Sequence, residues 1–252
     1  MKYTTYLIFL CLALSACSVT DTKAVSDDLK LLANTSSAAC NKKPDPSLTQ
    51  FIVGYGSLMQ KASRLRTAPN AETAYAVELK GYRRGWFTKG SSTGFSTTYL
   101  GAVTDPSAHI NAVIFAVSPE ELSALDRRES GYCRSAIEPG QLIVQGKAEK
   151  LPGAQFWIYS NNASSIALPT QEMPLVQSYI DIFLSGCMEL EEQYTLKDFA
   201  RECINTTTDW SDHWVNDRIY PRRPFIYQPR ASQIDQLLRE TLPALFRKIT
   251  IE

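Results

Sequence analysis

The sequence predicts an α+β fold with a mostly β core, and three observations support this prediction. Strand-like segments rich in β-branched and aromatic residues follow one another up to Tyr159. A single helix interrupts them, beginning at the capping-box sequence Ser118–Glu121 (SPEE) and ending near Gly131. Beyond Tyr159, apolar residues recur at helical spacing, first over Leu175–Leu184. Strands that enclose one helix and are then followed by helices indicate an α+β domain.

The predicted strands are short and are bounded by turn residues. Phe51–Val53 stops at Gly54, where a cluster of glycine, tyrosine and serine begins. Ala112–Val117 is nearly all apolar, which predicts burial on both faces of the sheet. The other predicted strands are Tyr75–Leu79, Tyr99–Val103, Gln141–Val144 and Gln155–Tyr159.

The first residues have the pattern of a bacterial export signal. Lys2 gives a positive start, Tyr6–Leu14 is an uncharged apolar run, and Leu14–Cys17 (LSAC) ends it with small residues. The run is too short to span a bilayer, which takes about 20 residues. Cys17 favours a lipoprotein signal with stable lipid anchoring, and an ordinary secretory signal with a chance cysteine is the alternative. Ser18 favours the outer membrane, so we expect a cell-envelope protein facing the periplasm.

The chain divides by composition into four parts. Ser, Thr, Asp, Lys and Ala dominate the stretch after Cys17, which predicts a flexible tether with at most a short helix over Asp27–Leu32. Near the C-terminus, Thr195 is placed to cap a helix through Cys203, and Ser232 is placed to cap another over 233–241. The predicted parts are the signal at 1–16, the lipidated cysteine and tether at 17–48, the folded domain at 49–190 and a helical extension at 191–252.

The overall composition excludes some classes of function. Lys and Arg number 26, and Asp and Glu also number 26, so the charge gives no reason to expect a nucleic-acid partner. The hydrophobic content of 44% is ordinary for a globular protein, and we expect a monomer. His109 and His213 stand in no metal-ligand spacing, so no metal site is expected.

The sequence has six cysteines, and four remain once Cys11 is placed in the predicted signal and Cys17 is assigned to lipid. An even number in an oxidising compartment indicates disulfides, and four cysteines allow three pairings. Cys187 and Cys203 are the preferred pair, because each lies near the end of a predicted helix and a short loop separates them. Cys40 and Cys133 would then tie the N-terminal segment to the core, and free buried thiols are the alternative.

One loop has the composition of a ligand-binding turn. The first predicted strand runs directly into Gly54-Tyr55-Gly56-Ser57-Leu58. Two glycines let a backbone approach a ligand closely and turn its N–H groups toward it. The spacing of these two glycines alone does not separate such a loop from a plain tight turn, and no GxxxxGK[ST] or GxGxxG motif occurs elsewhere.

Glu129 is the candidate catalytic side chain, because it stands at the predicted end of the capped helix. The negative end of a helix dipole disfavours a carboxylate, which raises its pKa and suits a general base. The alternative is a solvated glutamate that pairs with Arg127 or Arg128 on an exposed turn.

These motifs together resemble the gamma-glutamylcyclotransferase superfamily, most closely its ChaC-like and AIG2-like branch. Phe51–Leu58 (FIVGYGSL) is similar to the first motif of that branch, and Leu125–Tyr132 (LDRRESGY) is similar to the second. Between them, Leu79–Arg84 (LKGYRR) resembles a strand of the family, and Gln177–Asp181 with Gly186 resembles its C-terminal helix. The resemblance covers about residues 50–190.

The resemblance implies a fold, a reaction and roles for residues. The fold is a mixed β-barrel with flanking helices, here followed by a helical C-terminal extension. The reaction cyclises a γ-glutamyl group of glutathione, a γ-glutamyl peptide or a γ-glutamyl amine to 5-oxoproline and releases the amine partner, with no cofactor. Glu129 is implied as the base, and the backbone N–H groups of Tyr55–Leu58 are implied to hold the oxyanion and the substrate carboxylate. Arg83 and Arg84 are equally suited to binding a carboxylate or to lying on the strand surface.

A second function stays open at this point. A non-catalytic envelope lipoprotein could use the same fold as a ligand- or partner-binding module. The segment Trp210–Pro229, dense in Trp, Tyr and Arg, has the composition of a partner surface. The same segment also fits a proline-rich strap that packs on the barrel.

Overall fold

The computed structural model describes residues 17–36, 40–90, 97–146, 153–223 and 230–252. The predicted signal sequence at 1–16 lies outside these residues. No helix in the described ranges has the length and apolar character needed to cross a membrane.

In the described part of the chain, seven strands form the main sheet. They are β1 Thr49–Gly54, β2 Ala74–Lys89, β3 Thr98–Val117, β4 Cys133–Ile137, β5 Leu142–Val144, β6 Ala154–Ser160 and β8 Thr207–Thr208. The order is β4-β6-β1-β3-β2-β5, and β8 also pairs with β2. β1 pairs antiparallel with β3 and parallel with β6, so the sheet is mixed. Since β4 and β5 do not pair with each other in the described residues, the sheet is a curled half-barrel.

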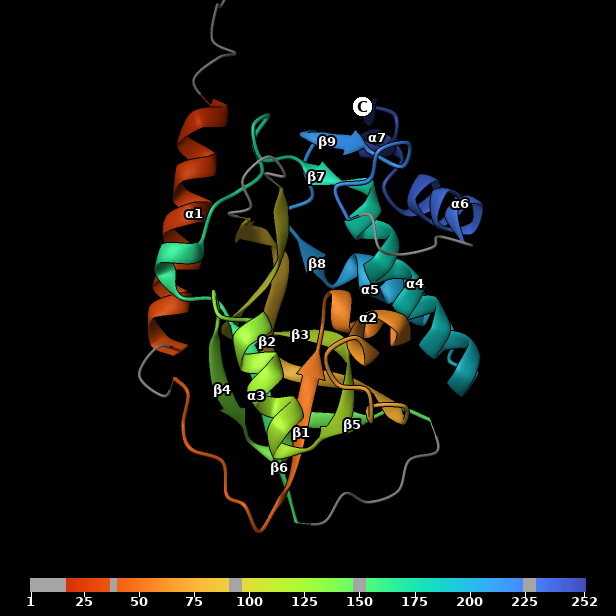
Figure 1. The fold of residues 1–252 in the computed structure, drawn as a ribbon. Coiled ribbons are helices and arrows are strands. Elements are labelled where there is room, and N and C mark those ends of the chain that lie inside the picture. Colours follow the sequence, from red (N-terminus) through yellow and green to blue (C-terminus); the bar gives the residue numbers. More distant parts are fainter. Residues whose placement is uncertain (1–16, 37–39, 91–96, 147–152, 224–229) are drawn as a thin grey trace, which may run out of the picture.

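The remaining elements surround this sheet. The helices are α1 Cys17–Ser36, α2 Lys61–Leu65, α3 Pro119–Arg128, α4 Gln177–Tyr194, α5 Phe199–Asn205, α6 Ala231–Thr241 and α7 Pro243–Phe246. Short 3₁₀ turns occur at Ser57–Met59, Pro139–Gln141 and Ala163–Ser165. A small parallel sheet contains β7 Leu175–Val176, β9 Trp214–Asn216 and β10 Thr250–Ile251. Figure 1 shows α1 along one side of the main sheet and α2, α4, α5 and α6 gathered on the opposite side. The predicted α+β class is confirmed.

β2 and β3 form one long antiparallel pair at the centre of the sheet. The pairing runs from Ala74 opposite Phe115 to Lys89 opposite Thr98. Two of the predicted strands therefore belong to the single strand β3. The register shifts between Lys80 and Tyr82, a β-bulge of the kind that bends a strand and helps a sheet to curl. Residues 112–115 and Val117 are buried, as their apolar character predicts, whereas Ala116 is exposed, so burial on both faces holds for most of this segment.

The capping box predicts the start of α3 correctly. The Ser118 hydroxyl accepts a hydrogen bond from the Glu121 backbone N–H at 3.2 Å, and the Glu121 carboxylate accepts one from the Ser118 N–H at 2.9 Å. Leu122 and Leu125 are buried against the sheet. The helix ends at Arg128, so Glu129 occupies the C-cap position.

The prediction of a flexible tether over 17–48 is wrong for its first half. Residues 17–36 form α1, in which Leu29 and Ala33 are fully buried on the outer face of the sheet. They pack with Phe87, Val103 and Ile166 as a second, smaller core. The polar composition of this stretch conceals apolar residues spaced four apart, which place one stripe of the helix on the sheet.

Two cap assignments in the C-terminal part are also corrected. Thr195 does not begin a helix but ends α4, in the left-handed conformation with φ 52°. The next helix, α5, begins at Phe199 after Asp198. α6 begins at Ala231, with Arg230 rather than Ser232 at the N-cap position. The C-terminal extension is therefore helical as predicted, with short strands between its helices.

Two disulfides connect distant parts of the chain. Cys187 and Cys203 link α4 to α5, with Cα atoms 6.6 Å apart. Cys40 and Cys133 link the segment after α1 to the start of β4, with Cα atoms 5.2 Å apart. A covalent link lowers the entropy of the unfolded chain, so both disulfides favour the closed packing of the N-terminal and C-terminal segments on the sheet.

The docking of α1 predicts an asymmetry between two neighbouring leucines. Leu29→Ala removes a fully buried side chain, so the free energy of unfolding should fall by about 2 kcal/mol or more. Leu31 is 66% exposed on the same helix, and Leu31→Ala should change that free energy by no more than about 0.5 kcal/mol. Equilibrium urea unfolding of the two variants measures the difference. Equal values for both would mean that α1 is not docked on the sheet in solution.

Candidate active site

The loop Tyr55–Leu58 lies between the end of β1 and the side of α4. A Cβ atom on Gly56 would lie 2.9 Å from the Tyr179 hydroxyl of α4. A Cβ atom on Gly186, two turns further along α4, would lie 2.3 Å from the backbone nitrogen of Gln60. Both contacts are too close for any larger residue, so the two glycines let α4 lie directly against the loop.

A small cavity opens beside this loop, with a volume of about 30 Å³. Its walls include Tyr55–Leu58, Glu129 and the tyrosines Tyr132, Tyr159 and Tyr179. The two motifs that stand far apart in the sequence therefore meet at one place. The cavity is small for a ligand of several heavy atoms, so entry of such a ligand requires movement of the side chains at its edge. Of the five loop residues singled out in the sequence, Gly54 does not line the cavity and packs beneath Leu58.

The Glu129 carboxylate is held at the cavity by the neighbouring arginine. Its Oε1 atom lies 3.1 Å from Nε of Arg128, and its side chain is 17% exposed. The remaining N–H groups of Arg128 bind the Ser57 hydroxyl at 3.1 Å and, beyond it, the end of α2. Arg128 thus connects the carboxylate to the loop. Glu129 is therefore not a solvated glutamate on an exposed turn.

The pKa of Glu129 is raised above its ordinary value of 4.5. Burial of the carboxylate is the largest cause, and the positive charges of Arg128 and Arg223 act in the opposite direction. The pKa of Glu129 is shifted in the direction expected for a carboxylate at the C-terminal end of a helix. Removal of the carboxylate from water makes the largest contribution to this shift. A carboxylate in this position has a stronger affinity for a proton than an exposed glutamate while it keeps a cationic neighbour.

The cavity tyrosines are neutral hydrogen-bonding groups. Burial raises the pKa of Tyr55 and of Tyr132 well above 10 and raises that of Tyr179 to about 12. The Tyr55 hydroxyl donates to the carbonyl oxygen of Tyr159 at 2.6 Å, and the Tyr132 hydroxyl donates to that of Leu100 at 3.1 Å. For Tyr179, no acceptor of its hydroxyl proton lies among the described residues. Its O–H is therefore available to a ligand in the cavity.

Arg83 and Arg84 do not bind a ligand at this cavity. Arg83 points outward, where it pairs with Asp105 of β3 and with Asp28 of α1 at 2.7 and 3.1 Å. Arg84 is fully buried and donates to the Tyr55 carbonyl oxygen at 3.2 Å from inside the half-barrel. Arg84 therefore neither binds a substrate carboxylate nor lies on the strand surface. It supports the loop from the interior of the half-barrel.

The two histidines and the acidic side chains form no metal centre in the structure as described. No group of three or more His, Cys, Asp or Glu residues within the described ranges is arranged to hold a metal ion. His213 lies far from Glu129 in the sequence, beside the small sheet, where its backbone carbonyl accepts a hydrogen bond from the Leu175 N–H.

Comparison with known proteins identifies the part of the chain that forms this site. The profile of the family described as "Gamma-glutamyl cyclotransferase, AIG2-like" matches residues 52–176. Residues 52–176 are therefore similar to this family. The matched stretch contains both the loop Tyr55–Leu58 and Glu129. The resemblance to the superfamily is therefore confirmed for the residues that form most of the cavity wall.

Solved structures with a similar fold are distant in sequence. A protein described as "Gamma-glutamyl cyclotransferase" has 13% identity and a TM-score of 0.46, with 75% of this chain and 99% of that chain covered. YkqA from Bacillus subtilis has 17% identity and a TM-score of 0.44, covering 62% and 53%. A yeast gamma-glutamyl cyclotransferase specific to glutathione has 12% identity and a TM-score of 0.38, covering 63% and 97%. No curated protein matches the chain, and we transfer no residue role from the three structures.

Some residues of the site were not singled out in the sequence. The sequence suggests Arg128 only as a surface partner of Glu129, and it assigns no role to Tyr132 and Tyr179 within their motifs or to Tyr159 at the end of a predicted strand. The sequence of a motif does not show whether a tyrosine in it points into a cavity or into the core. Arg223 lies outside the family match and offered no local signal beyond the aromatic and basic composition of its segment.

The electrostatics of Glu129 predict a specific titration. Carbon-13 NMR of the carboxyl groups should give Glu129 a pKa above 4.5, whereas exposed Glu120 of the same helix should titrate below 4.5. Arg128→Gln removes a charge that lowers the pKa of Glu129, so it should move that pKa further up. Because folding raises this pKa, the contribution of Glu129 to stability is present below 4.5 and is lost as the pH rises through the folded value. A Glu129 pKa that does not respond to Arg128→Gln would contradict the contact.

Proposed function

We propose that this protein cyclises the γ-glutamyl group of a small substrate to 5-oxoproline and releases the amine to which that group was attached. The observation that carries the proposal is the meeting of Glu129 with the loop Tyr55–Leu58 in one cavity. The carboxylate has a raised pKa, as a general base requires, and Arg128 joins it to the loop. The family match over the same residues supports this reaction class.

The reacting groups of such a substrate belong to one molecule. The α-amine nitrogen forms a bond to the γ-carbonyl carbon, and the amide C–N bond to the leaving amine breaks. The protein therefore needs no nucleophile of its own, and tethering of the two groups supplies much of the rate acceleration. What remains for the protein is to assist the proton transfers, to stabilise one developing charge and to hold the substrate in a bent conformation.

Glu129 is the group that moves the proton in this proposal. Its carboxylate takes a proton from the α-ammonium, which makes the amine nucleophilic, and then gives this proton to the leaving nitrogen. The second proton that the attacking nitrogen loses as the lactam forms passes to the departing amine, which leaves as an ammonium ion. Burial raises the pKa of the carboxyl and strengthens the base, while the charges of Arg128 and Arg223 act in the opposite direction. The two effects together suit a group that must both accept and return a proton near neutral pH.

The developing oxyanion needs hydrogen-bond donors. Tyr55–Leu58 and Tyr179 line the cavity, and we assign the backbone N–H groups of this loop and the hydroxyl of Tyr179 to this task. The Ser57 N–H already donates to the Tyr179 hydroxyl, which links the two parts of this donor set. Tyr179 is suited to it because its hydroxyl stays protonated, with its pKa raised to about 12, and because it lies against Gly56.

We also propose that the protein acts in the cell envelope, anchored by lipid on Cys17. The argument is the order of charge, apolar run and small residues before that cysteine. α1 begins at Cys17 and packs on the domain from Val25 onward, which leaves about 12 Å of helix between the two positions. The domain would then lie close to the membrane on a helical spacer, and its substrates would be γ-glutamyl compounds of the periplasm.

A binding module without activity is the competing function. Its main support was the composition of Trp210–Pro229. Within the described part of this segment, Trp214 is 1% exposed and Arg218 pairs with Asp181 and Asp235, so these side chains are used inside the protein. Phe225 and Tyr227 lie outside the described residues. A strap packed on the domain describes Trp210–Asp217 better than a partner surface does, whereas Tyr220, further along the segment, is 83% exposed.

The test of the proposed reaction is release of 5-oxoproline by the full-length chain from glutathione, γ-glutamyl dipeptides and γ-glutamyl amines. Glu129→Gln keeps the shape of the side chain but cannot accept the proton, so turnover should fall by about a hundredfold or more. Glu120→Gln, on the exposed face of α3, is the matched control and should retain the activity of the wild type.

The two variants separate the competing functions. Full activity of Glu129→Gln would remove this carboxylate from the mechanism. No turnover of any compound by the wild type, with the fold intact by circular dichroism, would favour the binding module.

A further inference from the structure

Arg223 brings a positive charge to the edge of the cavity from outside the matched domain. Its guanidinium lies over the ring of Tyr99 at 5.3 Å and near the ring of Tyr179 at 5.9 Å. Tyr179 is itself a wall of the cavity. The charge of Arg223 also lowers the pKa of Glu129, which indicates that the two groups are close.

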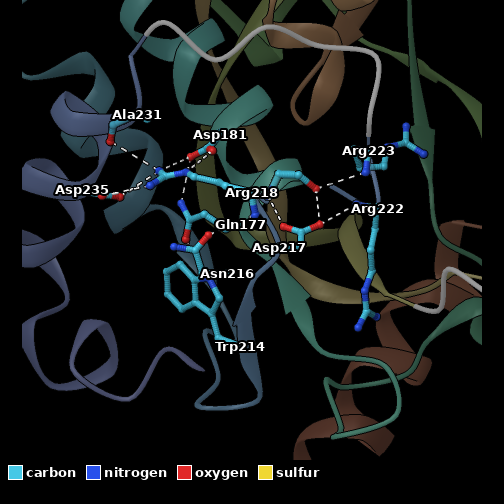
Figure 2. Close-up of polar contacts among 11 residues, drawn as sticks. Gln177, Asp181, Trp214, Asn216, Asp217, Arg218, Arg222, Arg223, Ala231 and Asp235 are labelled. Carbon is cyan, nitrogen blue, oxygen red and sulfur yellow. Dashed lines mark hydrogen bonds and ion pairs between the residues drawn. The ribbon is translucent and has the colours of Figure 1, made fainter. Parts of the chain in front are cut away.

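No carboxylate of the described residues neutralises this charge. The hydrogen-bond partner of the Arg223 guanidinium is the Tyr99 hydroxyl at 3.3 Å, and it forms no ion pair within the described ranges. The neighbouring Arg222 differs, because its Nε lies 3.0 Å from the carboxylate of Glu252. Figure 2 shows the two arginine side chains pointing in opposite directions. A half-buried guanidinium with unused donors beside a cavity is suited to binding an anion.

The backbone of Arg223 is held in place at the start of α4. Asp217, which is 1% exposed, accepts hydrogen bonds from the Ser178 N–H at 2.7 Å and from the Ser178 hydroxyl at 2.6 Å. The same carboxylate accepts the Arg222 N–H at 2.7 Å, and the Arg223 N–H donates to the Ser178 hydroxyl at 3.2 Å. Figure 2 shows this chain of contacts. Ser178 directly precedes Tyr179, so the network fixes Arg223 relative to the wall of the cavity.

Resting on the proposed function, we infer that Arg223 binds a carboxylate on the amine side of the substrate. The cyclising γ-glutamyl end must lie against Glu129 and the loop Tyr55–Leu58, which form the cavity itself. Arg223 is separated from this end by Tyr179 and stacks on Tyr99, which is not part of the wall. The part of the substrate that extends past Tyr179 is the leaving amine. The preferred substrates are therefore γ-glutamyl amino acids and peptides rather than γ-glutamyl derivatives of simple amines.

Binding measured without turnover tests this inference separately from the proposed reaction. The full-length Glu129→Gln variant is titrated by calorimetry with γ-glutamylglycine, which has a carboxylate on the amine side, and with γ-glutamylethylamide, which has none. Adding Arg223→Gln should raise the Kd of γ-glutamylglycine by about tenfold or more and leave that of γ-glutamylethylamide unchanged. Arg223→Lys keeps the charge but not the forked donor geometry, so it should recover part of the loss.

Arg222→Gln is the matched control, since it removes the adjacent arginine, whose side chain pairs with Glu252 and points away from that of Arg223. It should change neither Kd. Equal weakening of both compounds by Arg223→Gln would overturn the inference and assign Arg223 to the α-carboxylate or to packing. Unchanged binding of both would overturn it as well. A wild type that binds γ-glutamylglycine through Arg223 but releases no 5-oxoproline would contradict the proposed reaction alone.

Discussion

The buried guanidinium of Arg84 joins four parts of the chain inside the half-barrel. It lies on β2, is fully buried and has its pKa lowered to about 9 by removal from water, so it remains charged at neutral pH. Removing such a charge from water costs several kcal/mol unless its donors are satisfied. Here uncharged groups satisfy them, at 2.8 to 3.2 Å: the carbonyl oxygens of Tyr55, Asn111 and Cys203 and the side chains of Asn111, Thr206 and Thr207. The position of the loop after β1 therefore depends on a cation that never reaches the cavity.

The same contact makes the C-terminal extension part of the site rather than an appendage. Arg84 binds the end of α5, and the disulfide of Cys203 binds that helix to α4. Beyond α5, the ring of Trp210 packs on Trp86 of β2 at 5.1 Å. Next, Asp217 attaches the chain to the start of α4, which presents Tyr179 to the cavity. The family match ends at residue 176. The loop and the base of the site lie within this match, whereas α4 and the later segments, which complete the site, lie outside it.

The sequence predicted the local features of this arrangement well and its long-range contacts poorly. The capping box, the strand before Gly54 and the position of Glu129 depend on neighbours within a few residues, so their patterns are visible in the chain. Arg84 could not be recognised, because its acceptors come from segments up to 123 residues away and none is acidic. The docking of α1 was missed for a related reason. Apolar residues of α1 such as Leu29 hold the helix in place only because Phe87 and Val103 lie on the outer face of β2 and β3 and pack against them.

Three influences set the proton affinity of Glu129, and they come from different layers of the structure. Burial under the tyrosines raises its pKa, Arg128 of the same motif lowers it, and Arg223 of the extension lowers it further. A buried carboxylate with no cationic neighbour would be protonated too readily to act as a base. An exposed carboxylate paired with an arginine would have too low a pKa to take a proton effectively. Because Arg223 lies on a segment that the family match does not include, the acidity of the base can change without any change in the loop or in Glu129 itself. In the proposed reaction, an anionic group of the substrate bound by Arg223 would screen its charge and raise the pKa of Glu129, so that substrate binding would strengthen the base.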